Sequence, residues 1–303
     1  MNKYDVIVVG AGPAGMNAAI YANRAGLSVL MLEKGAPGGQ MVNTAEVENY
    51  IGLGKLGGAD LALKMFNHTQ SLGVEYKYGE VIDIIDGESK IVKTTDAEYE
   101  ATAIIIATGT VPRALGAINE DRFAGNGISW CAICDGPLYK EKDVLVIGGG
   151  NSAIEEAIYL AGLAKSVTIL ARKTLRASNS YIEKTEKYDN ISIIKDTSVE
   201  EFVGEATLTG AKLINNVTKE KSEISVDGVF IFVGFIPKTD ILSKFEILDS
   251  AGYIETNEFM ETKIKGIYGA GDVIVKHLRQ IATAINDGAI AAMQAGKYIE
   301  DQK

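Results

Sequence analysis

A short apolar run, a glycine-rich turn and a helical stretch that leads to a second apolar run occur twice in this chain. The first copy comprises a strand at 4–9, the turn 10–15, a helix to about residue 25 and a strand at 28–32. The second comprises a strand at 143–147, the turn 148–153, a helix to about residue 161 and a strand at 166–170. Val- and Ile-rich strands that alternate with helices are typical of a parallel sheet covered on both faces. The repeat predicts an α/β chain with two Rossmann-like, doubly wound nucleotide-binding domains.

The rest of the chain contains further β-strand patterns. Hairpin strands are predicted at 76–85, 89–94 and 97–103, followed by a buried strand at 104–106 that runs into the turn Ala107-Thr108-Gly109. Strands are also predicted around 191–195, 212–215 and 228–233, and a helix from about 280 to 298. We therefore expect a smaller antiparallel β-layer beside each parallel central sheet.

The first glycine-rich turn has the spacing Gly10-x-Gly12-x-x-Gly15, and Glu33 follows Gly15 by 18 residues. Glycines at these positions allow a tight turn, close approach of the backbone to a pyrophosphate, and close packing of helix on strand. Glu33 is placed to accept hydrogen bonds from an adenosine ribose. The alternative is a turn without a ligand, but the strand, the helix and the acid together favour a dinucleotide.

The second turn, Gly148-x-Gly150-x-x-Ala153, has the same layout, but the same offset reaches Ala171 in place of an acid. Three cations follow: Arg172, Lys173 and Arg176. Without a carboxylate for a free 2′-hydroxyl, this pattern favours a 2′-phosphate, and hence NADP over NAD. The alternative is that the three cations are solvated surface charges.

The only two cysteines, Cys131 and Cys134, are separated by two residues and followed by Asp135. Zinc normally takes four ligands, and the only histidines, His68 and His277, are distant in sequence, so we expect no metal site. A redox-active disulfide is favoured over a buried pair of free thiols. Asp135 is the candidate acid/base for thiol exchange, with a turn residue as the alternative.

The charge and the apolar runs of the chain limit the classes of partner that it can bind. The net charge of −10 disfavours nucleic acid and anionic membranes. No apolar stretch approaches the roughly 20 residues that a membrane-spanning helix needs, and the apolar run at 6–9 is too short for a signal peptide. We expect a cytoplasmic protein, in which a cysteine pair is more typically catalytic than a structural crosslink. The loops at Gly38-Gly39-Gln40 and Asn49 are weaker candidates for contacts with a flavin.

Over nearly its whole length the chain resembles the low-molecular-weight bacterial thioredoxin reductases. The dithiol directly precedes the second turn, as it does in that family. The matching segments are Gly10–Gly15, Gly38-Gly39-Gln40, Glu46–Tyr50, Ala107-Thr108-Gly109, Cys131–Gly136, Gly148–Glu156, Gly269–Val273 and Leu278-Arg279-Gln280.

The resemblance implies a homodimeric flavoprotein that transfers electrons from NADPH to FAD, then to a Cys131–Cys134 disulfide and finally to thioredoxin. It implies an FAD domain formed by residues 1–112 and 241–303, and an NADPH domain formed by residues 113–240. The implied FAD residues are Gly10, Gly12, Pro13, Ala14, Gly15, Glu33, Lys34, Gly38, Gly39, Gln40, Asn49, Ala107, Thr108, Gly109, Gly271, Asp272, Arg279, Gln280 and Ile281. The implied NADPH residues are Gly148, Gly150, Asn151, Ser152, Ala153, Glu156, Arg172, Lys173 and Arg176. Cys131, Cys134 and Asp135 would carry the chemistry.

One segment departs from the family. Its members commonly carry His-Arg-Arg-x-x-x-Arg for the 2′-phosphate, whereas this chain has Ala171-Arg172-Lys173-Thr174-Leu175-Arg176. The His is absent, one Arg is Lys, and the last Arg is one residue closer. Lys is a point charge and not a bidentate fork. NADH or reduced ferredoxin therefore stays open as electron donor, and a non-catalytic redox-sensing flavoprotein is the alternative from another class.

Overall fold

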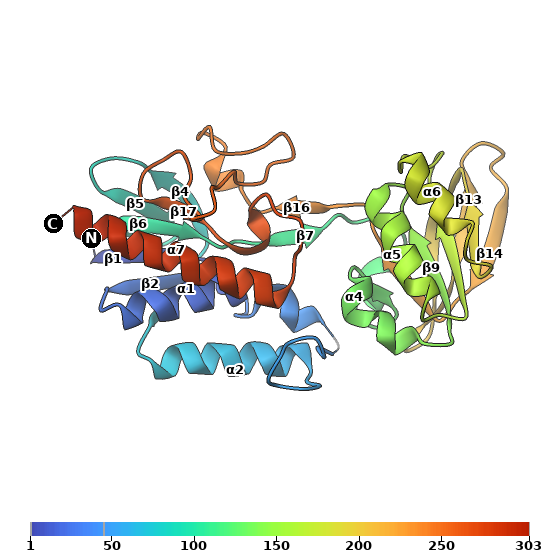
Figure 1. Cartoon of the computed structure of the whole chain (residues 1–303), viewed down its shortest axis with the longest axis horizontal. Helices are drawn as coiled ribbons and strands as arrows, with labels where there is room; N and C mark the ends of the chain where they lie inside the picture. The colour runs from blue at the N-terminus through green and yellow to red at the C-terminus, as the bar shows by residue number, and fades with distance from the viewer. Residues whose placement is uncertain (1, 45, 303) are drawn as a thin grey trace. The chain divides into compact units, whose positions relative to one another are not determined.

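The computed structural model describes residues 2–44 and 46–302. Met1, Ala45 and Lys303, which all fall in the predicted FAD domain, lie outside the described residues. The chain forms two compact units. Unit 1 comprises residues 2–44, 50–111 and 236–302, and unit 2 comprises residues 46–49 and 112–235. Both ends of the chain therefore belong to unit 1 (Figure 1).

Unit 1 is built on a seven-stranded sheet whose centre is the parallel pair β1 (Asn2–Val9) and β6 (Glu98–Ile106). The strand order is β3 (Glu75–Tyr78), β2 (Val29–Glu33), β1, β6, β5 (Lys90–Thr94) and β4 (Val81–Ile85), with β17 (Ile267–Gly269) also on β6. The far edge of β6 is shared: residues 98–101 pair antiparallel with β5, and residues 104–106 pair parallel with β17. One long strand thus joins the parallel sheet to the antiparallel hairpin.

Two strand predictions in unit 1 are wrong. The residues predicted as separate strands at 97–103 and 104–106 form the single strand β6. The residues predicted as one strand at 76–85 form two, because the chain leaves the sheet edge at Gly79, whose N–H donates to the Glu33 carbonyl. β3 then pairs in parallel with β2, whereas β4 pairs antiparallel with β5.

Helices α1 (Pro13–Arg24) and α7 (Ile281–Asp301) lie side by side across one face of this sheet (Figure 1). Small residues permit the close approach: a Cβ placed on Gly288 of α7 would lie 2.1 Å from the Ala14 carbonyl oxygen of α1. Helix α2 (Gly58–Ser71), which the sequence patterns did not predict, packs on α1. The packing of α7 on α1 at Ala14 holds the start of α1, where the first glycine-rich turn ends.

Unit 2 contains a parallel sheet in which β9 (Asp143–Ile147) is central. The order is β11 (Ile191–Ile194), β10 (Ser166–Leu170), β9, β15 (Gly228–Ile231) and β8 (Ile128–Ser129). Side chains of β9 alternate between two cores: Val144 and Val146 pack with α5 (Asn151–Ala161), whereas Leu145 and Ile147 face the other core. Burial on both faces explains why the strand is apolar at every position from Val144 to Ile147.

The second core of unit 2 is covered by a separate antiparallel sheet of β12 (Thr197–Gly204), β13 (Leu208–Asn215) and β14 (Lys221–Ser225). The sequence patterns predicted only part of β13 in this sheet. Polar side chains occupy half of the positions of β12 and all but one of β14, which weakens the strand pattern. Helix α6 (Asn179–Thr185) follows β10, and α3 (Glu120–Phe123) precedes β8. The predicted class, α/β with two Rossmann-like domains and antiparallel layers, is confirmed.

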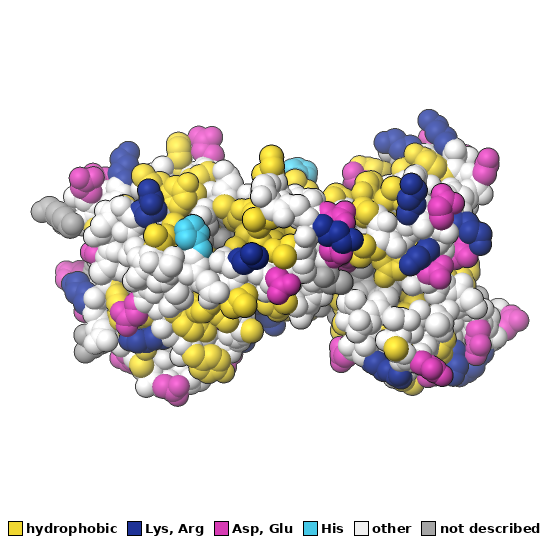
Figure 2. Space-filling view, turned by 90° about the horizontal axis from the view of Figure 1, so that it is seen from below, with side chains coloured by type: hydrophobic (Ala, Val, Ile, Leu, Met, Phe, Trp, Pro, Cys, Tyr) yellow, Lys and Arg dark blue, Asp and Glu magenta, His cyan; other side chains and the backbone are white. Residues whose placement is uncertain are grey.

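The chain passes between the units at β7 (Thr110–Pro112) and β16 (Phe235–Pro237), which pair with each other. Within the described residues no helix has both the length and the apolar character needed to cross a bilayer. Figure 2 shows hydrophobic side chains gathered in patches between charged ones. In unit 1, α1 and α2 flank a groove lined by Met16, Ile20, Met65 and Leu72, among others.

Candidate active site and dinucleotide sites

The two cysteines are joined in a disulfide, as predicted, with their Cα atoms 5.3 Å apart. Cys131 follows β8 after one residue, Trp130, and is the N-cap of the single-turn helix α4 (Ala132–Asp135), so that both sulfurs belong to one helical turn. The Cys134 N–H donates to the Cys131 sulfur across this turn at 3.2 Å. No group of three or more metal-ligating side chains is found in the part of the chain that the structure describes.

Asp135 ends α4 and is held in a buried site. Its Oδ2 accepts a hydrogen bond from the Ser129 hydroxyl at 2.6 Å. Its Oδ1 is buried and has no hydrogen-bond partner among the described residues. Burial raises the pKa of this carboxyl, and the hydrogen bond from Ser129 partly offsets that rise. Burial also raises the pKa of Tyr139 to about 12, with the charge of Asp135 as a further cause.

The first glycine-rich turn leaves no room for a side chain at Gly10 or Gly15. A Cβ on Gly10, whose φ is +109°, would lie 2.4 Å from the Ala107 carbonyl oxygen, and one on Gly15 would lie 1.9 Å from the Gly10 carbonyl oxygen. Helix α1 begins after Gly12, which offers no side chain to cap the first N–H groups. Those groups are left for an external anion.

Glu33, at the end of β2, is fixed against this turn by backbone groups. Its Oε2 accepts from the Ala11 N–H at 2.9 Å, and its Oε1 accepts from the N–H groups of Lys34 and Gly35 at 2.8 and 2.9 Å. The Lys34 ammonium pairs with Glu80 at 2.8 Å. Three backbone donors therefore hold the carboxylate beside the turn at the position predicted for ribose recognition.

The segment around Gly38 and Gly39 approaches the same turn. The Gly38 N–H donates to the Ala11 carbonyl at 2.8 Å, and a Cβ on Gly12 would lie 4.0 Å from the Gly39 Cα. The 3-10 helix η1 (Gly39–Asn43) follows, and the Gln40 amide donates to the Thr110 hydroxyl at 3.1 Å. Asn49, which the family resemblance adds to this set, belongs to the short stretch that groups with unit 2.

A second buried carboxylate without a partner occurs in unit 1. Oδ1 of Asp272, in the short helix η4 (Gly271–Val273), has no hydrogen-bond partner among the described residues. Burial raises the pKa of Asp272, and the nearby charges of Lys276 and Arg279 oppose the rise. The Arg279 guanidinium donates to three carbonyl groups of the same loop, including that of Asp272.

The loop is tied to helix α7 by a buried ion pair. Asp287 of α7 pairs with Lys276 and also accepts from the Gly271 N–H at 3.1 Å. Gln280 caps the start of α7 at Ile281 through reciprocal hydrogen bonds with Thr283. The predicted FAD residues Gly271, Asp272, Arg279, Gln280 and Ile281 thus lie in or next to a loop that these contacts hold in place. Oδ1 of Asp272 is without a partner among the described residues.

The second glycine-rich turn has the same construction. A Cβ on Gly148, whose φ is +154°, would lie 2.6 Å from the Phe232 carbonyl oxygen, whereas the space beside Gly150 is open. Helix α5 begins at Asn151, whose side chain accepts from the Ser178 N–H at 2.9 Å. Gly150, like Gly12, offers no capping side chain. This turn can therefore also receive a phosphate.

Glu156 lies on the second turn of α5 and is partly buried. Its Oε2 is shielded from solvent and has no partner among the described residues. Burial, and to a lesser extent the neighbouring charge of Glu155, raise the pKa of Glu156 to about 7. A buried acceptor of this kind, close to the phosphate turn, suits a polar group of a bound nucleotide.

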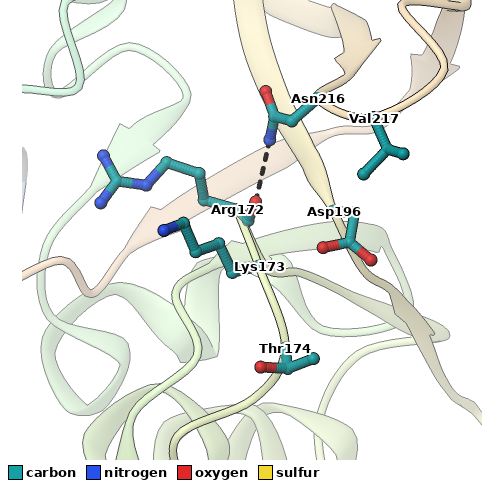
Figure 3. Close-up of a pocket in the computed structure, with 6 residues that line it drawn as sticks. All are labelled: Arg172, Lys173, Thr174, Asp196, Asn216 and Val217. Carbon is teal, nitrogen blue, oxygen red and sulfur yellow. Dashed lines mark hydrogen bonds between the residues drawn. The ribbon is translucent and has the colours of Figure 1, made fainter.

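The basic segment after β10 lines an open pocket in unit 2 (Figure 3). Of the described residues, six line it: Arg172, Lys173, Thr174, Asp196, Asn216 and Val217. Arg172 and Lys173 extend to the same side in Figure 3, away from the Asp196 carboxylate. The Asn216 amide donates to the Arg172 carbonyl at 2.9 Å. Two of the three predicted cations are therefore brought together.

Arg176 is placed differently from the other two cations. Its backbone N–H donates to the Gly149 carbonyl at 2.6 Å, and its side chain is exposed. It is absent from the six residues that line the pocket among those described. The structure thus ties Arg176 to the glycine-rich turn by its backbone and leaves the pocket cations to Arg172 and Lys173.

Two structural features of each unit fit a bound dinucleotide. Each has a glycine-rich cradle at an uncapped helix start. Each also has a buried carboxylate oxygen without a partner among the described residues, that of Asp272 in unit 1 and, besides that of Asp135, that of Glu156 in unit 2. Only unit 1 has an acid at the end of the second strand. The two sites therefore suit different nucleotides.

Comparisons with known proteins agree with this construction. Residues 4–288 match the model of the pyridine nucleotide-disulphide oxidoreductase family. The chain is 48% identical to a thioredoxin reductase of Listeria monocytogenes over 303 residues, covering 99% of this chain and 95% of that protein. It is 46% identical to one of Bacillus subtilis over 301 residues, covering 98% and 95%. The crystal structure of thioredoxin reductase from Streptococcus pyogenes superimposes with a TM-score of 0.94, at 44% identity and 99% coverage of both chains.

The chain therefore belongs to the pyridine nucleotide-disulphide oxidoreductase family, and within it to the low-molecular-weight bacterial thioredoxin reductases. The family prediction made from the motifs is confirmed. FAD and NADPH are the cofactors that membership in this family implies.

Several residues of these sites were not predicted from the sequence. Ser129 contacts Asp135, Asp196 and Asn216 line the basic pocket, and the pair of Lys276 and Asp287 anchors the Asp272 loop. None of them lies within a recognisable motif, and each reaches its site through pairing of strands or packing of helices. A spacing pattern in one sequence does not reveal such contacts.

Proposed function

We propose that this protein is an NADPH-dependent thioredoxin-disulfide reductase that works in the cytoplasm as a homodimer. The observation that carries the proposal is the Cys131–Cys134 disulfide, which is followed by the buried Asp135 and lies in the unit with the second dinucleotide turn. Family membership supports thioredoxin as the protein substrate. The cytoplasmic location is the expectation drawn from the sequence itself, and the homodimer is carried over from the resemblance to the family.

We assign FAD to unit 1 and NADPH to unit 2. Gly10, Gly12 and Gly15 would receive the FAD pyrophosphate, Glu33 its adenosine ribose, and Asp272 a hydroxyl of its ribityl chain. The turn from Gly148 to Ala153 would receive the NADPH pyrophosphate, Glu156 a polar group near the nicotinamide, and Arg172 and Lys173 the 2′-phosphate. The chemistry of each donor set supports these assignments, since anions face N–H groups or cations and hydroxyls face carboxylates.

When bound, NADPH and FAD supply the two electrons that open the Cys131–Cys134 bond, and two protons complete the dithiol. Asp135 then accepts a proton from one thiol, and the resulting thiolate attacks a sulfur of the thioredoxin disulfide. The thioredoxin disulfide breaks, a mixed disulfide forms, and Asp135 returns the proton to the departing thioredoxin sulfur. The second cysteine closes the Cys131–Cys134 bond and releases thioredoxin as a dithiol, and its own proton goes to the second thioredoxin sulfur.

The experiment that tests this proposal separates the two halves of the reaction. Cys131→Ser and Cys134→Ser should each reduce thioredoxin turnover to background, because no disulfide can form in the enzyme. Both variants should keep the rate at which NADPH bleaches the flavin under anaerobic conditions. Thioredoxin turnover that survives in either variant would refute the assigned route through the disulfide.

A further inference from the structure

Ser129 is the last residue of β8 and lies two residues before the redox disulfide. It is only 4% exposed, although its side chain is polar. A buried hydroxyl is normally retained only where it is hydrogen-bonded. The contacts of Ser129 connect the backbone of Cys131 with the carboxylate of Asp135.

The hydroxyl has three neighbours within hydrogen-bond distance. Its oxygen accepts from the Cys131 N–H at 3.1 Å. Its single proton faces Oδ2 of Asp135 at 2.6 Å and the Cys131 carbonyl at 3.3 Å. The shorter contact is to a carboxylate, and hydrogen bonds to charged acceptors are the stronger ones. The Ser129 proton is therefore directed at Oδ2 of Asp135.

The two oxygens of Asp135 are thus inequivalent. Oδ2 is occupied by the Ser129 proton, whereas Oδ1 is buried and unpartnered among the described residues. A proton that binds Asp135 goes to the oxygen without a donor. We propose that Ser129 is a positioning residue that fixes the Asp135 carboxyl and directs its exchangeable proton to Oδ1. This inference rests on the proposed role of Asp135 as acid/base.

The other ionisable groups around α4 come from the two elements packed against it. The 3-10 helix η2 (Gly136–Tyr139) contributes Tyr139, whose pKa of about 12 keeps it neutral at physiological pH. Helix α5 contributes Glu155, Glu156 and Tyr159. Besides Asp135, α4 and its N-cap carry only the two disulfide cysteines. Burial raises the pKa of Asp135, and the hydrogen bond from Ser129 is the one contact that lowers it.

The test uses the pH profile of thioredoxin reduction by the FAD-loaded enzyme. The acidic limb should report the pKa of Asp135, because the ionised carboxylate must accept a thiol proton. Ser129→Ala removes the bond that stabilises the ionised form, so the acidic limb should move to higher pH by about one unit. Ser129→Thr keeps a hydroxyl, so its acidic limb should lie close to that of the wild type. Anaerobic bleaching of the flavin by NADPH should be unchanged in both variants.

Two comparisons make the outcomes distinct. If Asp135→Asn leaves the profile as in the wild type, the acid/base role of Asp135 fails, and the proposed function must be revised at that residue. If Asp135→Asn changes the profile but Ser129→Ala does not move the limb, the present inference alone is overturned. In the Asp135→Asn background, Ser129→Ala should cause no further shift, and a full shift there would also refute it.

A second measurement needs no change at Ser129. Reduced-minus-oxidised infrared spectra of the wild type should contain a carboxylic acid C=O band that disappears in Asp135→Asn. With the proton on Oδ1, the C=O group is formed by Oδ2 and accepts from Ser129, so the band should lie at the low frequency of a hydrogen-bonded carbonyl. A band at the frequency of a free carbonyl would overturn the inference, even if the Ala variant did not fold.

Discussion

The two glycine-rich turns share glycines at their first and third positions but differ at several other corresponding positions, and three of these differences separate the two units most clearly. The first turn ends in Gly15 and the second in Ala153. Three residues further along the helix, a buried Ala18 in α1 corresponds to Glu156 in α5. At the end of the next strand, unit 1 has Glu33 and unit 2 has Ala171.

The comparison separates the parts of the motif that build a turn from those that choose a ligand. Gly10 and Gly148 both have positive φ, and a Cβ on either would lie within 2.6 Å of a backbone carbonyl oxygen. These positions serve the fold in both units. The acid at the strand end and the side chain on the second helical turn differ, and we propose that these positions serve the nucleotide. Three substitutions probe this division, in order of expected effect.

The largest effect should come from Gly15→Ala. Its Cβ would lie 1.9 Å from the Gly10 carbonyl oxygen, and neither backbone segment can move without disturbing the β1–α1 packing. Overpacking of this kind costs about 3 kcal/mol or more. We expect a loss of that size in the free energy of unfolding of the apoprotein, together with loss of bound FAD. Urea unfolding and the ratio of flavin to protein absorbance measure the two effects.

The matched control is the reciprocal change in the second turn. Ala153→Gly removes a buried Cβ that is already accommodated. It should cost the helix propensity of Ala over Gly, about 1 kcal/mol, and roughly another 1 kcal/mol for the lost burial of the methyl group. NADPH binding should be kept. Equal losses in Gly15→Ala and Ala153→Gly would show that the two turns do not differ in the way the structure indicates.

The sequence alone gave the two turns, the dithiol and Glu33, because these depend on spacing within short segments. It also predicted central strands such as β9, since the residues Val144–Ile147 are buried on both faces and form an uninterrupted apolar run. It failed at β3 and β4, where the chain changes from parallel pairing with β2 to antiparallel pairing with β5. It also missed β12 and β14, whose polar faces weaken the pattern.

The residues of the candidate sites also divide into those that the sequence predicted and those that it missed. Arg172 and Lys173 were found because charge beside a strand end is visible in the sequence. Asp196 and Asn216 reach the same pocket from the separate antiparallel sheet, and Ser129 reaches Asp135 from a strand of two residues. Contacts of this kind depend on the pairing of strands far apart in sequence, which no local pattern specifies.

The second prediction concerns the strand end that has lost its acid. Arg172→Ala removes one of the two pocket cations, and a hydrogen bond to a charged phosphate contributes about 1.5–3 kcal/mol. The KM for NADPH should therefore rise by roughly 10- to 100-fold. The KM for NADH, which lacks the 2′-phosphate, should change little. Steady-state kinetics with both donors and a fixed concentration of thioredoxin decide the matter.

Arg176 provides the control within the same segment. It is an exposed cation whose contact with the turn is made by its backbone, and the pocket is lined without it among the described residues. Arg176→Ala should raise the KM for NADPH by less than about threefold, as expected for an exposed charge. If Arg172→Ala raises the KM values for NADPH and NADH alike, the pocket does not select the 2′-phosphate.

The smallest effect should come from Glu156, which replaces the buried alanine of the first unit. Its pKa of about 7 in the folded chain lies above the value of about 4.3 expected for an unfolded Glu. As pH rises between these values, the unfolded state loses its proton first, so the folded state becomes progressively less favoured. The cost is absent well below pH 4 and complete above pH 7. Glu156→Gln removes the ionisation and should raise the Tm at pH 8.

The expected rise for Glu156→Gln is about 2–4 °C, equivalent to roughly 1 kcal/mol for a chain of this size, because the partial exposure of Glu156 weakens the effect of burial. The rise should shrink steadily as the pH of the melting experiment falls from 8 to 5. Glu155→Gln is the matched control: it removes the lesser cause of the raised pKa on an exposed neighbour, so its effect should be smaller at every pH. A Tm difference for Glu156→Gln that does not depend on pH would mean that Glu156 is ionised in the folded enzyme throughout this range. The second unit would then hold a charged side chain where the first holds an alanine, and burial of Glu156 would have no energetic cost. The proposal that Glu156 is reserved for the nucleotide would lose this support.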